Sequence, residues 1–436
     1  MQPQDVLSTM ARHMIVDGFD FVLDHERSQG SVLVDLRDGT EYLDMFSFFA
    51  SNALGMNHPA LLKDEVSQHL ARIAINKPSN SDVYSAEIAG FVKVFARVLG
   101  DPRLDHLFLI EGGALAVENA LKAAFDWKSQ KNEQAGRDPS LGTQVLHLTG
   151  AFHGRTGYTM SLTNTEPKKV ARYPKFDWPR IDAPYLSFPL DENAEANRRR
   201  EEHALKQVRQ ALEADGHDIA CFIAEPIQSE GGDRHISPRF LREVQELCHE
   251  HDVLFALDEV QTGVGLTGTH WCYEQLDLEP DLVAFGKKTH VCGVMAGGRI
   301  NEIEDNVFVT PSRLNSTFGG NLVDITRMTY VLEIIEQEDL VSRAAELGDH
   351  LIARLHDLAA RHDAMNNVRG RGLMCAFDLR DGDTRDRVLR SIFEDEQVFL
   401  IGCGPASVRF RPPLTVTEAE LDSAADALDR VLDRVT

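Results

Sequence analysis

Short apolar runs alternate with stretches of helical periodicity through the middle of the chain. Apolar runs of four to eight residues are typical of buried strands, whereas apolar positions that recur every three or four residues indicate helices. We predict a helix at residues 85–99 and strands at residues 106–110, 143–148, 219–226, 253–259 and 282–285. Strands separated by helical connections predict a mostly parallel sheet that is covered on both faces, which is an α/β fold.

The two ends of the chain show a different pattern. Two β-rich runs flank Asp38-Gly39 within residues 31–46, which predicts a hairpin. From about residue 326 onward, long helical patterns give way to short apolar runs and a final helix, which predicts an α+β lobe. We therefore expect an N-terminal segment at 1–60 that joins a small domain, a large domain at 61–325 and a C-terminal α+β domain at 326–436.

Composition and charge exclude several classes of function. The 436 residues carry a formal net charge of −24, which disfavours binding to nucleic acid and to anionic membranes. The six cysteines are scattered without a C-x-x-C pair, so we expect neither a disulfide framework nor a zinc knuckle. No secretion signal and no apolar run of membrane-spanning length is found. These features predict a cytoplasmic protein.

The residues that follow each predicted strand are the first candidates for a site, because ligands of open α/β sheets bind beyond the carboxyl ends of the strands. Gly112, Gly113 and Ala114 stand between the first of these strands and a helix. Their backbone N–H groups and the positive end of the helix dipole would bind an anion. A tight turn between strand and helix explains the glycines equally well.

Flat rings and charged groups follow the next two strands. Phe152 and His153 offer rings for a planar ligand, and Arg155 offers a fork of N–H groups for a carboxylate. Glu225 and Glu230 follow the strand after that. Each of these residues also suits an ordinary loop, with a packed ring, a surface ion pair or a turn. Singly, none of them identifies a site.

Asp258 and Lys287 are the strongest signals of chemistry. A carboxylate at the mouth of a buried strand needs a fixed cation, such as a pyridinium N–H. A helix cap or a metal ligand is the alternative for Asp258, but no histidine pair at ligand spacing lies nearby, and we predict no metal site. Lys287 directly follows Gly286 at a strand end, where loss of water lowers the pKa of an amine and leaves it nucleophilic.

Together these residues supply a binding partner for each of four groups of pyridoxal 5′-phosphate: the phosphate, the ring face, the pyridine nitrogen and the aldehyde. Adjacent lysines such as Lys287 and Lys288 are usually surface residues when considered alone. Beside Asp258 and the anion cradle, Lys287 becomes a Schiff-base lysine. Lys288 keeps the ordinary interpretation, a neighbour that turns away from the ring.

The chain resembles the class-III (ω) aminotransferases, which are pyridoxal phosphate enzymes of fold type I. Segments spread over most of the chain carry the resemblance: NKPSNSDVY (76–84), EGGALAVENALKAAFDWKS (111–129), LDEVQTGVGLTGTHW (257–271), AFGKKTHVCGVMAGG (284–298) and RLNSTFGGN (313–321). It implies a mostly parallel seven-stranded sheet flanked by helices, plus a small α+β domain from both chain ends. It also implies a homodimer with active sites at the interface.

The resemblance implies a role for each matching residue around the cofactor ring. Lys287 would form the Schiff base, and Asp258 would hold the pyridinium. Val260 and Phe152 would pack on the two faces of the ring. Gln261 would reach the phenolic oxygen and contact the substrate.

The phosphate is expected to bind at Gly113 and Ala114, with Thr317 reaching the phosphate of the neighbouring subunit. The sequence departs from the family pattern in three places. The phosphate loop has Gly112 to Leu115 in place of hydroxyl-bearing residues, and Leu322 replaces the proline after G-G-N. Thr289, His290 and Cys292 interrupt the run after the lysine. These departures indicate a divergent branch of the family.

Within the family, the resemblance is to members that transfer the ε-amine of L-lysine to 2-oxoglutarate. Arg409 would bind the α-carboxylate of 2-oxoglutarate, and Glu230 would pair with Arg409 while lysine is bound and then swing away. Arg155 would grip the distal carboxylate, and residues 76–84 would form part of the donor pocket. Arg411 is the competitor for the role of Arg409, since both face one side of an extended segment. Ornithine, 4-aminobutyrate or 2,4-diaminobutyrate as the donor, or an aminomutase reaction, are alternatives.

Overall fold

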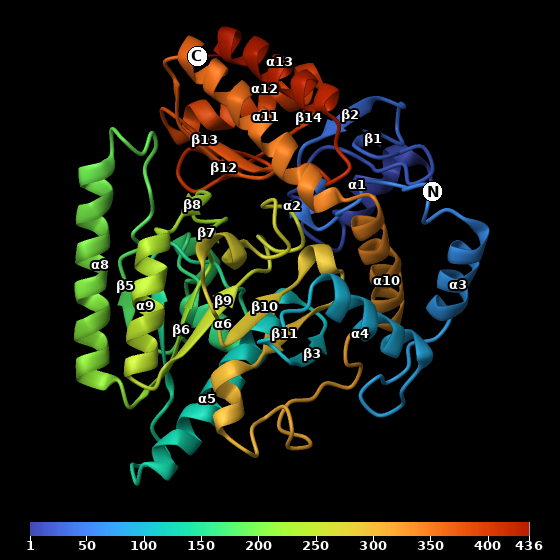
Figure 1. The fold of residues 1–436 in the computed structure, drawn as a ribbon. Coiled ribbons are helices and arrows are strands. Elements are labelled where there is room, and N and C mark those ends of the chain that lie inside the picture. The colour runs from blue at the N-terminus through green and yellow to red at the C-terminus, as the bar shows by residue number, and fades with distance from the viewer. Residues whose placement is uncertain (436) are drawn as a thin grey trace.

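The structure is a computed structural model that describes residues 1–435. At its centre lies a seven-stranded sheet with the strand order β3-β11-β10-β9-β6-β4-β5 (Figure 1). Its strands are β3 (His106–Ile110), β4 (Gln144–Leu148), β5 (Arg180–Ile181), β6 (Ile219–Ala224), β9 (Leu254–Asp258), β10 (Leu282–Phe285) and β11 (Cys292–Ala296). All five strands predicted for this region form, and the predicted α/β fold is confirmed.

Two strands of this sheet, β5 and β11, were not predicted from the sequence pattern, and β11 differs from the others in direction. It runs antiparallel to both of its neighbours, β10 and β3. The pairs from β10 through β9, β6 and β4 to β5 are all parallel. Gly293 weakens the strand signal of this segment, yet the structure requires it, because a Cβ there would lie 2.6 Å from Cζ of Phe285. The sheet is therefore mixed but mostly parallel.

Helices cover both faces of this sheet (Figure 1). The helix α5 (Gly113–Gln134) packs on one face, and α4 (Ala86–Val98), α8 (Ala194–Asp215), α9 (Pro238–Glu250) and α10 (Leu322–Gln337) contribute to the core on the other. Successive residues of a strand point to opposite faces. Accordingly Phe222 and Phe255 pack on the face away from α5, whereas their neighbours Ile223 and Ala256 pack toward it.

The C-terminal part of the chain forms a second lobe above the sheet (Figure 1). Its sheet has the order β12-β13-β16-β15, with β12 (Met365–Arg371), β13 (Met374–Leu379), β15 (Ile401–Cys403) and β16 (Ser407–Phe410). The helices of this lobe are α11 (Leu340–Arg361), α12 (Gly382–Glu396) and α13 (Glu418–Val435). An α+β lobe was predicted for this part of the sequence, and the structure has one.

Both ends of the chain meet in a small three-stranded sheet. The predicted hairpin forms from β1 (Val32–Val34) and β2 (Glu41–Asp44), and β14 (Val398–Phe399) pairs in parallel with β2. The domain boundaries at 60/61 and 325/326 stay a prediction. The remaining short elements are η1 (Pro3–Asp5), α1 (Val6–Met10), α2 (Ser47–Ala50), α3 (Asp64–Ala74), α6 (Gly157–Leu162), α7 (Pro167–Val170), β7 (Ile227–Gln228), β8 (Arg234–His235), η2 (Cys272–Leu276), η3 (Lys287–Thr289) and η4 (Gly298–Glu302).

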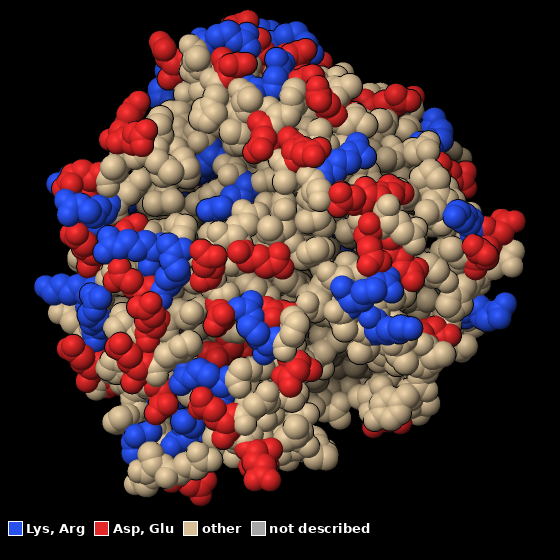
Figure 2. All heavy atoms as spheres, viewed as in Figure 1, with Lys and Arg blue, Asp and Glu red and all other residues tan. Residues whose placement is uncertain are grey.

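The surface and the cysteines agree with the composition. Figure 2 shows acidic and basic side chains interspersed over the visible face. Within residues 1–435, no helix has the length and apolar character needed to cross a membrane. All six cysteines are buried and free of disulfide bonds.

Candidate active site

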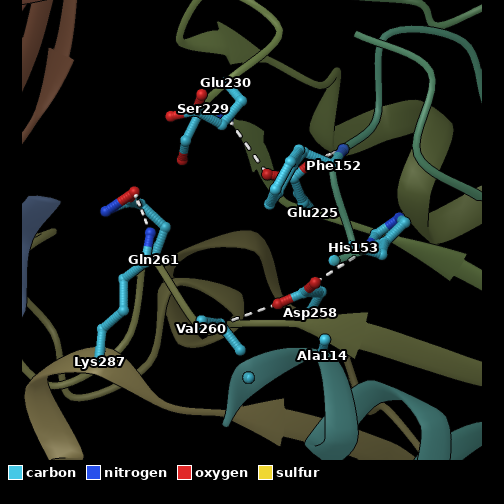
Figure 3. A pocket seen from close by; sticks show the side chains of 12 residues that line it. Ala114, Phe152, His153, Glu225, Ser229, Glu230, Asp258, Val260, Gln261 and Lys287 are labelled. Carbon is cyan, nitrogen blue, oxygen red and sulfur yellow. Dashed lines mark hydrogen bonds and ion pairs between the residues drawn. The ribbon is translucent and has the colours of Figure 1, made fainter. Parts of the chain in front are cut away.

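A cavity of about 260 Å³ lies at the carboxyl ends of the central strands. Figure 3 shows side chains from separate strands and loops converging on it. Its lining consists of Gly113, Ala114, Phe152, His153, Gly154, Glu225, Ser229, Glu230, Asp258, Val260, Gln261 and Lys287. Most of the residues predicted for the site are therefore brought together around one space.

Lys287 occupies a turn directly after β10. Its backbone φ of 54° lies in the left-handed region, which is uncommon for a residue with a side chain and is found most often at functional sites. Its Nζ donates a hydrogen bond to Oε1 of Gln261 at 2.8 Å (Figure 3). Burial, helped by the charge of Arg409, lowers the pKa of Lys287 to about 8. At neutral pH a larger share of this amine is therefore unprotonated than in an ordinary lysine.

Lys288 turns away from the cavity, as predicted, but it is not a surface residue. Its side chain is buried, and its Nζ donates to the backbone carbonyls of Gln261 at 2.9 Å and Ala50 at 3.4 Å. Carbonyl oxygens thus replace water around the nitrogen, which is what allows a lysine in this position. Burial also lowers the pKa of Lys288 well below its ordinary value. Lys288 is therefore a buried structural residue, unlike the surface residues that adjacent lysines usually are.

Asp258 is held in place by two hydrogen bonds. Nδ1 of His153 lies 2.8 Å from Oδ2 of Asp258, and the backbone N–H of Val260 donates to Oδ1 at 3.0 Å (Figure 3). Burial opposes a charge on His153, but Asp258 outweighs it and raises the pKa of the imidazole. The sequence suggested His153 as a flat ring for the ligand. In the structure it instead orients the carboxylate.

Glu225 lies beside this pair beneath the cavity. It accepts hydrogen bonds from the backbone N–H groups of Phe152 at 2.9 Å and Ser229 at 3.2 Å. Burial raises the pKa of Glu225 to about 7. Its carboxyl therefore fixes the loop that carries Phe152.

The N-terminus of α5 forms another wall of the cavity, through Gly113 and Ala114. Gly112 is the N-cap and provides no side chain to the first turn, so the backbone N–H groups of Gly113 and Ala114 are open to an anion. A Cβ on Gly113 would lie 3.2 Å from Cγ1 of Val260. This glycine therefore lets the helix end approach Val260 closely.

Arg409 approaches the cavity from β16 in the C-terminal lobe. Its Nη2 donates to Oε1 of Glu230 at 2.6 Å, while its Nε and Nη1 are buried without a hydrogen-bond partner. Burial opposes the charge of Glu230, but Arg409 and Lys169 outweigh it and lower the pKa of Glu230 to about 2. Arg411 instead forms a fully buried pair with Asp233 at 2.5 Å. The structure therefore places Arg409, and not its competitor, beside Glu230.

Besides Arg409, which meets the cavity through its bond to Glu230, two further predicted residues do not line it. Arg155 is exposed and lines an adjoining hollow of about 640 Å³ together with Lys169. Thr317 is also exposed, on a surface loop that is bonded to residues 76–84 through Oγ of Ser81 and the carbonyl of Ser316 at 2.7 Å. Each would need a bound substrate or a second subunit to complete its predicted contact.

Lys169 is a site residue that the sequence interpretation missed. Its Nζ lies 3.3 Å from Oε2 of Glu230 and 5.4 Å from the centre of the Phe152 ring. In the sequence it stands beside Lys168 in a polar stretch, a pattern that is usual for surface residues. The only signal in the sequence was its position shortly after the segment that carries Phe152 and Arg155.

These features fit pyridoxal 5′-phosphate. The first turn of α5 offers N–H groups to a phosphate, and Phe152 and Val260 offer apolar faces to a ring. Asp258 offers a fixed carboxylate to a protonated ring nitrogen, and Lys287 offers an amine to an aldehyde. The fold and this cavity define a pyridoxal phosphate enzyme of fold type I.

The chain belongs to the class-III aminotransferases, and the family match covers residues 16–432. It is 60% identical over 436 residues to the L-lysine-epsilon aminotransferase of Mycobacterium tuberculosis, covering 100% of this chain and 96% of that protein. It is 56% identical over 430 residues to the L-lysine-epsilon aminotransferase of Streptomyces clavuligerus, covering 98% of this chain and 94% of that protein.

A solved structure gives the same result. The lysine aminotransferase from M. tuberculosis in the internal aldimine form matches with a TM-score of 0.98 and 59% identity, and 100% of both chains is covered. The predicted family, fold type and cofactor, pyridoxal 5′-phosphate, are confirmed.

Proposed function

We propose that this protein transfers the ε-amino group of L-lysine to 2-oxoglutarate, giving allysine (2-aminoadipate 6-semialdehyde) and glutamate. The pair formed by Arg409 and Glu230 carries the proposal. The ε-amine of lysine brings no carboxylate to Arg409, whereas 2-oxoglutarate does. A guanidinium that is 1% exposed needs a counter-charge in the first case and free N–H groups in the second. Glu230 supplies the counter-charge, and the unpaired Nε and Nη1 supply the free groups. The identity to L-lysine-epsilon aminotransferases supports the same donor.

The residues around the cavity are assigned roles in both halves of the reaction. When bound, pyridoxal 5′-phosphate supplies an aldehyde carbon that takes up the amine and a ring that takes up electrons. Lys287 would hold the cofactor through Nζ, and as a free amine it would take a proton from the ε-carbon of lysine and deliver it to the cofactor carbon. Asp258, oriented by His153, would hold a proton on the ring nitrogen of the bound cofactor. Gln261 is within hydrogen-bond reach of Lys287 and positions that amine.

Binding of the cofactor and of the distal end of the substrate is assigned to five residues. Gly113 and Ala114 would hold the phosphate through backbone N–H groups, and Phe152 and Val260 would enclose the ring. Arg155, at the mouth of the adjoining hollow, would bind the distal carboxylate of both substrates. Its exposed position supports this role, because a long donor such as lysine extends outward from the amine that reacts.

We infer that the protein works as a homodimer in the cytoplasm. Thr317 would reach the phosphate of the partner subunit, and residues 76–84 would contribute to the donor pocket across the interface. The hydrogen bonds between these two loops support a shared surface, and the exposed Val83 and Tyr84 give it apolar contact area. Six buried, unlinked cysteines support a reducing compartment.

The absorbance of the bound cofactor tests this function directly. L-Lysine is expected to remove the band of the resting holoenzyme, and 2-oxoglutarate is expected to restore it, with glutamate and cyclised allysine as products. Turnover of ornithine, 4-aminobutyrate or 2,4-diaminobutyrate with none of lysine would refute the donor. A product that retains the amine without 2-oxoglutarate would indicate an aminomutase and refute transamination.

A further inference from the structure

Glu230 has a second cationic partner besides Arg409. Its Oε1 accepts from Arg409 at 2.6 Å, while its Oε2 lies 3.3 Å from Nζ of Lys169 in α7. The two partners differ in their surroundings, because the side chain of Arg409 is 1% exposed and that of Lys169 is 18% exposed. Glu230 therefore bridges a buried cation at the cavity and a second cation at its mouth.

Lys169 is anchored independently of Glu230. Its Nζ lies 2.8 Å from Oε1 of Glu166 and 5.4 Å from the centre of the Phe152 ring. The neighbouring Lys168 pairs with the same Glu166 at 3.0 Å, but its side chain is 82% exposed and has no contact with Glu230. Lys169 is thus a fixed charge beside the site, and Lys168 is a matched charge that lies outside it.

The charges around Arg409 change between the two half-reactions. With the ε-amine donor bound, Arg409 and Glu230 neutralise one another. The α-carboxylate of 2-oxoglutarate brings a second negative group to the same guanidinium, and two carboxylates close together repel. One of them needs another cation. Lys169 is already within reach of the free oxygen of Glu230.

We propose that Lys169 is a positioning residue that holds Glu230 while the carboxylate of the acceptor occupies Arg409. Before the acceptor binds, Glu230 contacts both Arg409 and Lys169. Once the carboxylate of the acceptor occupies Arg409, Glu230 keeps only its contact with Lys169. The contact at 3.3 Å is long for a charged pair, and loss of the competing Arg409 allows it to shorten. This inference rests on the proposed function, because it assumes an acceptor that is an α-keto diacid and a donor without a carboxylate at Arg409.

Direct binding of a substrate carboxylate by Lys169 is the competing explanation. It would act in both half-reactions, since lysine and 2-oxoglutarate both carry a distal carboxylate. It would also act whether or not Glu230 is present. The two explanations therefore differ in a double-mutant cycle.

Equilibrium binding of glutarate, an unreactive diacid of the acceptor's length, to the holoenzyme tests the inference by calorimetry. Lys169→Met is expected to raise the Kd of glutarate about fivefold, which is the effect of one partly exposed ion pair. The same substitution in a Glu230→Ala background is expected to leave that Kd unchanged. Lys169→Arg is expected to restore the wild-type Kd, and Lys168→Met serves as the control for loss of a neighbouring charge.

Single-turnover half-reactions give a second readout. Lys169→Met is expected to slow the reaction of the pyridoxamine 5′-phosphate-loaded protein with 2-oxoglutarate more than the reaction of the holoenzyme with L-lysine. Equal losses in both half-reactions, or an equal rise in the glutarate Kd in both backgrounds, would overturn the inference in favour of direct binding. An unchanged Kd in the wild-type background would also overturn it. A wild-type protein that does not react with L-lysine would instead refute the proposed donor.

Discussion

Two pairs of like-charged residues that are close in the sequence show the same contrast, Lys287 with Lys288 and Arg409 with Arg411. One member of each pair contacts a side chain that lines the cavity, and the other is bound in the interior behind it. Lys287 lines the cavity with its amine on the side chain of Gln261, whereas Lys288 is bound by backbone carbonyls. Arg409 meets the partly exposed Glu230 and leaves Nε and Nη1 unpaired, whereas Arg411 meets the buried Asp233 and leaves Nε unpaired.

The difference lies in the partners of each cation. The partners of Lys288 and Arg411 are buried backbone carbonyls and a carboxylate that is 2% exposed. A ligand in the cavity therefore does not compete for these partners. Those of Lys287 and Arg409 are side chains at an open space, and one of them, Glu230, is 24% exposed. Lys287 and Arg409 therefore lie where a ligand can replace their partner, whereas Lys288 and Arg411 lie where no ligand can.

The largest expected effect separates the two lysines. Lys287→Ala removes both the nucleophile and the proton carrier, so we expect transamination to fall by roughly 10⁴-fold or more and the Schiff-base absorbance to disappear. Lys288→Met, which approximately keeps the side-chain volume, is expected to retain that absorbance. Absorbance spectra and initial rates of both variants check this. Loss of the band in the Lys288 variant alone would move the assignment by one residue.

The next effect separates the two arginines by stability. Arg411→Met leaves Asp233 buried and unpaired, and removing one partner of a buried pair costs about 3–5 kcal/mol in the free energy of unfolding. Arg409→Met is expected to cost less, because Glu230 retains Lys169 and is partly exposed to water. Urea unfolding of both apo-variants measures this difference. Equal losses of stability would remove the distinction between a locked pair and an exchangeable one.

A smaller effect concerns pH. The pKa of Lys287 is lowered to about 8 from an ordinary value of 10.5, chiefly by burial and next by Arg409. Only the unprotonated amine attacks an aldehyde, so the rate of cofactor attachment to the apo-protein is expected to rise with pH and level off above about 8. Arg409→Met is expected to move the midpoint upward, while Arg411→Met leaves it in place. A midpoint near 10 in the wild-type protein would contradict this account.

The sequence predicted those site residues whose position depends on a strand end alone. Phe152, Asp258 and Lys287 each follow an apolar run within a few residues, and the ends of parallel strands meet at one edge of the sheet. Because that geometry is local to each strand, no knowledge of side-chain packing was needed. The resemblance to the family added Arg409, and it gave a role to Glu230, which also follows a predicted strand.

The remaining contacts depend on packing between distant segments. The bond of His153 to Asp258 and the pair of Lys169 with Glu230 join side chains that are far apart in the chain. The burial of Lys288 depends on a carbonyl of Ala50, which comes from the N-terminal segment. In the sequence His153, Lys169 and Lys288 have the pattern of ordinary loop or surface residues, so no local signal indicates these contacts.

Stopped-flow half-reactions of Glu230→Ala test the central claim, that Arg409 exchanges Glu230 for the acceptor's carboxylate. Without Glu230 the guanidinium lacks a counter-charge while L-lysine is bound, but it still pairs with 2-oxoglutarate. The rate constant with L-lysine is therefore expected to fall about tenfold or more, as for loss of a charged hydrogen bond, and the rate constant with 2-oxoglutarate much less. Equal losses in the two half-reactions would contradict the exchange.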